Sequence, residues 1–266
     1  MKPHFLFLYA LLLLPIYTPH VLAGEQLHIA VASNFKKAQK ALTTLFETQY
    51  LLKNPHSKLK IINSSGSSGT LFAQIKNGAP YDVFLSADEL RPDTLIELGL
   101  AKKSNRLTYA QGQIVLWQPT ANKPFDITIL STYPKPYVLA NPKLAPYGAA
   151  SKALMEQSGL WKPRDSSRIL AHNIATSFQY AASGSVTLAW VAYSQIKTWE
   201  QHSKVSENSY WLPPVNDYPE INQVAVQLKR QKNQNLASQY ILFLAAPKAQ
   251  SLIKSFGYLI PKSTTE

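Results

Sequence analysis

The sequence predicts an α/β protein, and two observations lead to that prediction. The first third of the chain contains three segments in which an apolar strand pattern is followed by a short turn of small or polar residues and then by helical periodicity. Short strand and helix patterns continue to alternate through the rest of the chain. Such alternation is typical of sheets that are covered by helices.

The clearest of the three units surrounds the turn NSSGSSGT at 63–70. Alternating apolar residues, Leu59 and Ile61, precede the turn, and a helical pattern follows it to about Lys76, with Gly78 as the stop. Glycines let a ligand approach the backbone closely, while serine hydroxyls and the free N–H groups of a helix's first turn favour an anion. A flexible linker or an ordinary helix N-cap is the alternative interpretation.

The other two units place polar residues at equivalent points. The strand at 26–32 ends at Ser33 and Asn34, either of which can cap the next helix. The strand at 81–87 is followed by Asp88, which is placed to cap another helix. Because ligands of open α/β sheets bind at the carboxyl ends of the strands, we expect a site where these turns meet.

Shorter elements follow a change of pattern around residues 106–109. They are strands at 114–117, 137–140, 169–170, 186–191 and 223–228, helices at 148–158 and 174–182, and a helical pair over 234–256. A proline-rich stretch at 211–214 precedes the last strand, and the sequence contains no internal repeat.

Residues 1–23 are predicted to be a signal peptide. Lys2 supplies a thin positive n-region, residues 5–14 form the apolar core, and residues 21–23 offer small side chains at the cleavage site. Prolines interrupt a run that is already short for a membrane-spanning helix. The chain has no cysteine, which excludes a lipoprotein-type anchor and disulfides, so a packed core must stabilise the exported protein.

The formal net charge of +12 raises a nucleic-acid hypothesis. The basic residues, however, are scattered along the chain, without interleaved aromatic residues or a known nucleic-acid-binding module. We therefore interpret them as a solvated basic surface, which attracts small anions.

An exported serine-dependent hydrolase is an alternative from a different functional class. The serine turn lacks the G-x-S-x-G spacing of a nucleophile elbow. His172 is the one histidine with a place near the expected site, and the sequence pattern gives it no catalytic partner. Metal-ligand spacing of His, Asp and Glu is also missing, so we expect no catalysis, no direct metal-ion ligands and no cofactor.

Seven segments match, in order, the pattern of a known family. They are AVASNF (30–35), SSGSSG (64–69), AQIKNGAPYDVFLSADE (73–89), LANPKLAPYGAA (139–150), HNIATSFQYAASGSV (172–186), WVAYSQI (190–196) and APKAQSLIKSFGYLIP (246–261). In these segments the chain resembles the periplasmic molybdate-binding proteins of ABC transporters. It is similar to the branch that has an asparagine in the first turn and a tyrosine in the second lobe.

The resemblance implies the α/β fold of the type II, or Venus-flytrap, periplasmic binding proteins. In that fold two hinged lobes, each with a mixed sheet flanked by helices, hold the ligand between them. The implied division of the chain is a signal peptide at 1–23, a first lobe at 24–107 plus 222–266, and a second lobe at 108–221.

The resemblance also implies a set of ligand-binding residues. The matching positions are Ser33 and Asn34 in the first turn, Ser68 in the serine turn, Tyr147 in the second lobe and, through its backbone amide, Ile174. Another branch of the family places a ligand tyrosine where this chain has Ala192, so that role is not assigned here. Helix capping by the first-turn residues, packing of Tyr147 on Pro146 and a core position for the isoleucine are the alternatives.

These proposed donors are neutral hydroxyl and amide groups. A desolvated dianion needs many donors, and the lack of a carboxylate acceptor disfavours protonated oxyanions such as hydrogen phosphate. The resemblance implies a periplasmic, monomeric receptor that captures molybdate or tungstate and delivers it to the membrane permease of an ABC importer. A receptor for sulfate or another oxyanion is the alternative, because only the size of the anion separates molybdate and tungstate from sulfate. An iron receptor would require paired tyrosines, and the proposed ligand set contains one tyrosine.

Overall fold

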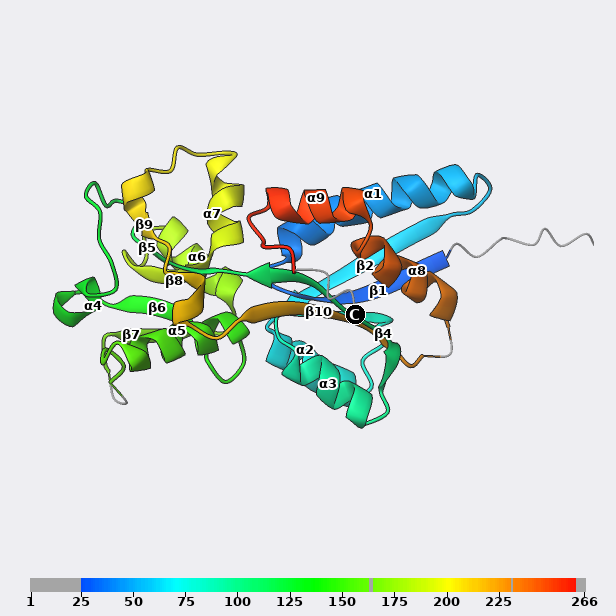
Figure 1. The fold of residues 1–266 in the computed structure, drawn as a ribbon, viewed down its shortest axis with the longest axis horizontal. Helices are drawn as coiled ribbons and strands as arrows, with labels where there is room; N and C mark the ends of the chain where they lie inside the picture. Colours follow the sequence, from blue (N-terminus) through cyan, green and yellow to red (C-terminus); the bar gives the residue numbers. More distant parts are fainter. Residues whose placement is uncertain (1–24, 163–164, 231, 262–266) are drawn as a thin grey trace, which may run out of the picture.

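The computed structural model describes residues 25–162, 165–230 and 232–261, which form two five-stranded mixed sheets flanked by helices (Figure 1). The predicted signal peptide at 1–23 lies outside the described residues. The two sheets belong to two bodies that lie side by side along the long axis (Figure 1). We call the body that contains residue 25 the first lobe and the other the second lobe. The predicted α/β class and two-lobed architecture are confirmed.

The sheet of the first lobe has the strand order β2-β1-β3-β10-β4. Its strands are β1 (Glu25–Ala32), β2 (Leu59–Gly66), β3 (Val83–Ser86), β4 (Ala101–Gly112) and β10 (Ile221–Leu228). Strand β1 is parallel to β2 and β3, whereas β10 is antiparallel to β3 and β4. The three parallel strands β1, β2 and β3 therefore end at the same edge of the sheet, and the turns that follow them meet there.

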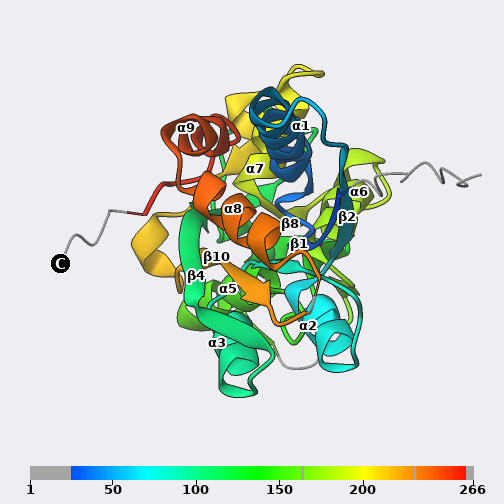
Figure 2. The same ribbon diagram turned by 90° about the vertical axis from the view of Figure 1, so that its right-hand side faces the viewer.

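Alternation of side chains along these strands gives each face of the sheet its own core. Ile29 and Val31 pack with α1, α8 and α9, while Ala30 and Phe84 pack with α2 and α3 on the opposite face. The view along the long axis shows these two groups of helices above and below the sheet (Figure 2). The helices of the first lobe are α1 (Lys36–Lys53), α2 (Ser68–Lys76), α3 (Leu90–Glu97), α8 (Gln234–Leu244) and α9 (Pro247–Ser255).

The sheet of the second lobe has the strand order β7-β6-β8-β5-β9. Leu116 and Leu139 pack with α5, while Val115 and Val138 pack with α6 and α7 on the other face. The strands are β5 (Ile114–Trp117), β6 (Tyr137–Ala140), β7 (Arg168–Ala171), β8 (Ala189–Ala192) and β9 (Tyr210–Trp211). The helices are α4 (Ile129–Thr132), α5 (Pro146–Gln157), α6 (Ile174–Ala182) and α7 (Tyr193–Glu200), with the 3-10 turns Glu207–Ser209 and Val215–Asp217.

The chain crosses between the lobes at two places, from β4 to β5 and from β9 to β10. Ile221 pairs in register with Gly112, so the two crossings run next to each other. Two adjacent connections of this kind suit a hinge, because small backbone rotations in both can move one lobe as a body. The lobe boundaries predicted from the sequence, at 107/108 and 221/222, stay predictions.

The sequence pattern did not predict one long strand and placed the start of another strand too early. Strand β4 extends over twelve residues, Ala101–Gly112, where the sequence indicated only a change of pattern. It is an edge strand of the sheet, paired with β10 along its length and with Leu259 through a single bridge at Gln111, and the polar residues at its partly solvated positions hide the strand signal. The strand predicted at 186–191 begins later, at Ala189, because a turn and bend over 183–187, with a positive φ of 76° at Gly184, separate the end of α6 from the strand.

The predicted helix caps are wrong at one place and supported at another. Ser33 and Asn34 do not cap α1, whose N-cap position is Phe35 with no side-chain hydrogen bond. The polar side chains of the first turn are therefore not used by the helix that follows. Asp88 does serve the start of α3, since its Oδ1 accepts the backbone N–H of Arg91 at 3.1 Å.

Candidate functional site

The turns at the carboxyl ends of β1, β2 and β3 are in direct contact. The backbone N–H of Ser33 donates to the carbonyl oxygen of Gly66 at 2.9 Å, which joins the first turn to the serine turn. The backbone N–H of Ala87, just after β3, donates to Ser68 Oγ at 2.9 Å. The structure thus brings the first-lobe turns together at one edge of the sheet, as the sequence predicted.

Two neighbouring serines have different roles at the start of α2. Ser67 is the N-cap residue, and its Oγ accepts the backbone N–H of Thr70 at 3.1 Å. Ser68 is the first helical residue and is 1% exposed. Because its oxygen already accepts the Ala87 N–H, its own O–H hydrogen remains able to donate to a bound group. The positive end of the helix dipole lies at the same point and favours an anion.

Asn34 connects the first lobe to Tyr147 of the second lobe. Asn34 Nδ2 lies 3.2 Å from Tyr147 Oη, 2.8 Å from Gln223 Oε1 and 3.1 Å from Tyr258 Oη. The hydroxyl of Tyr258 donates in turn to the backbone oxygen of Asn34 at 2.9 Å. Two amide hydrogens therefore face three acceptors, and the asparagine side chain is fixed at the junction of the lobes.

The phenol of Tyr147 is a neutral donor held in a dry environment. Tyr147 is 1% exposed, and this burial raises the pKa of its phenol well above the ordinary value, with the nearby tyrosines adding to the effect. Burial likewise raises the pKa of Tyr258 to about 12. Since Tyr147 Oη accepts from the asparagine amide, its hydrogen faces the neighbouring Tyr258 hydroxyl and can turn from it to a group placed between the lobes.

Ile174 occupies the first position of α6, and its side chain and its backbone have different surroundings. The side chain is 2% exposed and belongs to the same apolar cluster as Tyr147. The N-cap residue Asn173 accepts the backbone N–H of Thr176 at 3.0 Å through Oδ1. The N–H of the first helical residue has no partner within the helix, so it can serve a ligand. The carbonyl oxygen of Ile174 is fixed by Gln195 Nε2 at 3.2 Å.

A cavity of about 900 Å³ opens beside Ser33 and Asn34, between the start of α1 in the first lobe and α6 and α7 in the second. Its second-lobe wall includes the aromatic side chains of Phe178 and Trp199. Among the described residues that line the cavity, none is acidic. The first two turns of α1 contribute three lysines to its wall: Lys36, Lys37 and Lys40.

The five predicted ligand residues therefore fall into two groups. All five are buried, but only Ser33 and Asn34 line the cavity, whereas Ser68, Tyr147 and Ile174 do not. The cavity is in the size range of drug-sized ligand pockets and is far larger than a four-oxygen anion. A small anion therefore matches the buried corner next to the first turn and not the cavity as a whole.

Two further features of the described residues bear on function. No three His, Asp or Glu side chains gather there in a group that could hold a metal ion. None of the helices in the same part of the chain combines the length and the apolar character needed to cross a membrane.

Comparison with known proteins identifies the family. Residues 27–259 match the family model described as bacterial extracellular solute-binding protein. This chain belongs to that family. Its members are receptors and not enzymes, which agrees with the expectation drawn from the sequence.

This solute-binding protein is similar over most of its length to relatives that are named as molybdate-binding proteins. It is 34% identical to the molybdate-binding protein ModA of Rhodobacter capsulatus over 89% of both chains. It is also 34% identical to the molybdate-binding protein ModA of Azotobacter vinelandii, over 88% of this chain and 90% of the relative. The solved structure of the Azotobacter vinelandii periplasmic molybdate-binding protein matches with a TM-score of 0.79 at 33% identity, covering 89% of this chain and 100% of the other.

The sequence did not point to three polar residues that complete the corner in this solute-binding protein. Gln223 and Tyr258 hold Asn34, and Ser194 Oγ lies 3.5 Å from the asparagine backbone oxygen. Gln223 had a detectable signal, because a glutamine inside the apolar strand INQVAVQL must find a buried partner. The other two residues follow elements far along the chain and gave no local signal.

Proposed function

We propose that this solute-binding protein captures molybdate, and tungstate with it, between its two lobes and delivers the anion to the membrane permease of an ABC importer. The observation that carries the proposal is the donor set at the corner. Two buried hydroxyl groups, those of Ser68 and Tyr147, each accept a protein N–H, so each can direct its hydrogen toward an anion, with Tyr147 turning from the Tyr258 hydroxyl to do so. The similarity to two relatives named as molybdate-binding proteins supports the choice of anion.

The chemistry of these donors suits an oxyanion that carries no proton. Hydroxyl and amide groups donate to every oxygen of such an anion, and molybdate and tungstate are unprotonated dianions at neutral pH. A protonated oxyanion would need an acceptor, which the proposed ligand groups do not supply. We assign the ligand role to the Oγ atoms of Ser33 and Ser68, the Oη atom of Tyr147 and the backbone N–H of Ile174.

Asn34 receives a more specific role than the sequence suggested. Its side-chain amide faces Tyr147, Gln223 and Tyr258, so its hydrogens are engaged within the protein. In our proposal this side chain orients the tyrosine phenol toward the anion, and the asparagine contributes a backbone N–H from the turn before α1.

The proposed capture includes a movement of the lobes. The first-lobe turns receive the anion, and rotation about the adjacent crossings brings Tyr147 and the start of α6 onto it. The same movement narrows the cavity of about 900 Å³ that lies between α1 and the second lobe. The protein acts in this scheme as a monomer in the periplasm, after removal of the predicted signal peptide at 1–23, and sedimentation of the mature protein tests the monomer.

Calorimetric titration of the mature protein with molybdate, tungstate, sulfate and phosphate tests the ligand. We expect tight binding of molybdate and tungstate and far weaker binding of sulfate and phosphate. Sulfate binding as strongly as molybdate would show that size does not select the ligand, and would contradict the assignment. Tryptophan fluorescence follows lobe closure in the same samples, since several of the five tryptophans lie in the second lobe.

A further inference from the structure

The lobes touch at a second place, on the side of the sheets opposite the cavity. The backbone N–H of Gly69, next to Ser68, donates to the carbonyl oxygen of Leu144 in the second lobe at 2.9 Å. Arg91 Nη2, from α3 of the first lobe, donates to the carbonyl oxygen of Lys143 at 3.1 Å. Two consecutive carbonyl groups of the second lobe are therefore held by two donors of the first lobe.

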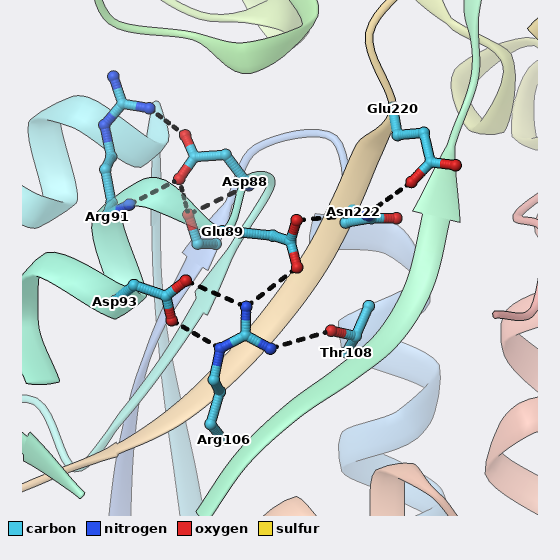
Figure 3. Close-up of polar contacts among 9 residues, drawn as sticks. Asp88, Glu89, Arg91, Asp93, Arg106, Thr108, Glu220 and Asn222 are labelled. Carbon is cyan, nitrogen blue, oxygen red and sulfur yellow. Dashed lines mark hydrogen bonds and ion pairs between the residues drawn. The ribbon is translucent and has the colours of Figure 1, made fainter. Parts of the chain in front are cut away.

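The arginine is held in place by a carboxylate of its own lobe. Asp88 accepts both the guanidinium and the backbone N–H of Arg91 (Figure 3). Asp88 Oδ1 also accepts the hydroxyl of Ser86, at the end of β3, at 3.2 Å. The Arg91 side chain is only 17% exposed, so its guanidinium has little freedom apart from this pairing and the contact with the second lobe.

The segment that these donors hold leads directly to Tyr147. The turn at 141–145 is closed by the backbone N–H groups of Leu144 and Ala145, which donate to the carbonyl oxygen of Asn141 at 3.0 and 2.9 Å. Pro146 then begins α5, and its ring fixes the backbone at the first helical position. Tyr147 follows at once, so a shift of the turn displaces the phenol with it.

The close fit at Gly69 shows how tightly the two turns meet. A Cβ atom at this position would lie 2.9 Å from the carbonyl oxygen of Leu144 and 3.1 Å from both Leu144 Cα and Arg91 Nη2. Any larger residue would therefore separate the serine turn from the second lobe. The glycine is required by the approach of the second-lobe backbone, because its own φ is not positive.

We propose that Arg91 is a positioning residue for anion binding, which with the Gly69 amide docks the 143–144 backbone onto the serine turn and so holds Tyr147 over the bound anion. The proposal rests on the anion site proposed above. It predicts that the contact acts on release more than on capture, since docking retains an anion that the first-lobe turns have already received.

Two variants test the two first-lobe donors of the contact. We expect Arg91→Gln and Gly69→Ala each to raise the molybdate dissociation rate roughly tenfold, with the association rate changed less than about twofold. Arg91→Lys keeps the charge but lacks the guanidinium fork, so it should restore the dissociation rate only in part. Stopped-flow tryptophan fluorescence measures both rates.

Arg106→Gln is the matched control. Arg106 is a first-lobe arginine that pairs with Asp93 at 2.6 Å and Glu89 at 3.0 Å, and these contacts and the one with Thr108 stay within that lobe (Figure 3). Its loss should lower the melting temperature and leave both molybdate rates unchanged. A dissociation rate of Arg91→Gln equal to that of the wild type, or its full restoration in Arg91→Lys, would overturn the proposal.

A measurement without ligand separates this proposal from the choice of anion. Amide hydrogen exchange of the peptide that contains Gly69 reports the bond to Leu144 directly. Faster exchange in Arg91→Gln than in Arg106→Gln is expected even if molybdate does not bind. Equal exchange in these two variants would refute the docking role, whereas a failure of molybdate to bind the wild-type protein would refute only the proposed ligand.

Discussion

The change Tyr147→Phe removes one hydroxyl from the buried corner between the lobes. In our proposal this group donates to the anion, and a hydrogen bond to a charged partner contributes about 1.5–3 kcal/mol. The affinity for molybdate should therefore fall by about tenfold to a hundredfold. The loss should appear mainly as faster dissociation, because the second-lobe contact forms on closure.

The fold should tolerate this change. The phenol is 1% exposed, and Phe keeps the ring that packs in the second-lobe core. Asn34 Nδ2 loses one acceptor but retains Gln223 Oε1 at 2.8 Å and Tyr258 Oη at 3.1 Å, so neither amide hydrogen is left alone. The free energy of unfolding without ligand should change by no more than about 1 kcal/mol.

Tyr109→Phe is the matched control. Tyr109 is 1% exposed, and its Oη has no hydrogen-bond partner among the described residues. Its ring packs edge-on against Phe35 at 4.9 Å, a contact that phenylalanine preserves. The control should bind molybdate as the wild type does, with equal or higher stability. If calorimetry gives Tyr147→Phe the affinity of this control, the phenol does not contact the anion and our reasoning about the second lobe is wrong.

Three other outcomes follow from the same site. Ser68→Ala should lower the affinity for molybdate by about tenfold to a hundredfold, as calorimetry would show. It should also lower the free energy of unfolding by about 1–3 kcal/mol in thermal melting, because the Ala87 N–H loses its acceptor. The affinity should stay constant from about pH 6 to about pH 9, since the Tyr147 pKa is raised above its ordinary value and the phenol donates only while protonated; a fall within that range would contradict this assignment. Three lysines line the cavity: Lys36, Lys37 and Lys40. Their replacement by glutamine should slow molybdate association several-fold at low ionic strength and should have no effect at about 1 M salt. Stopped-flow measurements give both rates, and an unchanged rate at low salt would exclude electrostatic steering by these lysines.

The sequence predicted the parts of the site that depend on neighbouring residues. The serine turn was recognisable because a strand pattern, small residues and helical periodicity follow one another within 59–76. The sequence alone did not assign the cap, which the structure gives to Ser67 and not to the candidate ligand Ser68. The strand order that brings the three turns to one edge agreed with the expectation for parallel strands.

The sequence could not predict the partners that depend on distant pairing. Asn34 meets Tyr147, Gln223 and Tyr258 across separations of 113, 189 and 224 residues. No local pattern encodes such contacts, because they exist only after both lobes have folded and met. The interpretation of Asn34 as a helix cap failed for this reason, since its amide is bound by tertiary partners in the native structure and α1 has Phe35 at its N-cap position.

The position of β10 has a consequence for how the chain reaches its native state. Among the described residues, this strand alone lies between β3 and β4 in the first sheet, yet it begins at Ile221, whereas the second sheet is complete by Trp211. The second lobe is built from one continuous stretch and can fold by itself, early, with contacts of modest sequence separation. The first lobe must wait for the last part of the chain before its central pairing forms. Binding competence is therefore expected to appear last, since the anion site needs both the early second lobe and the late first sheet.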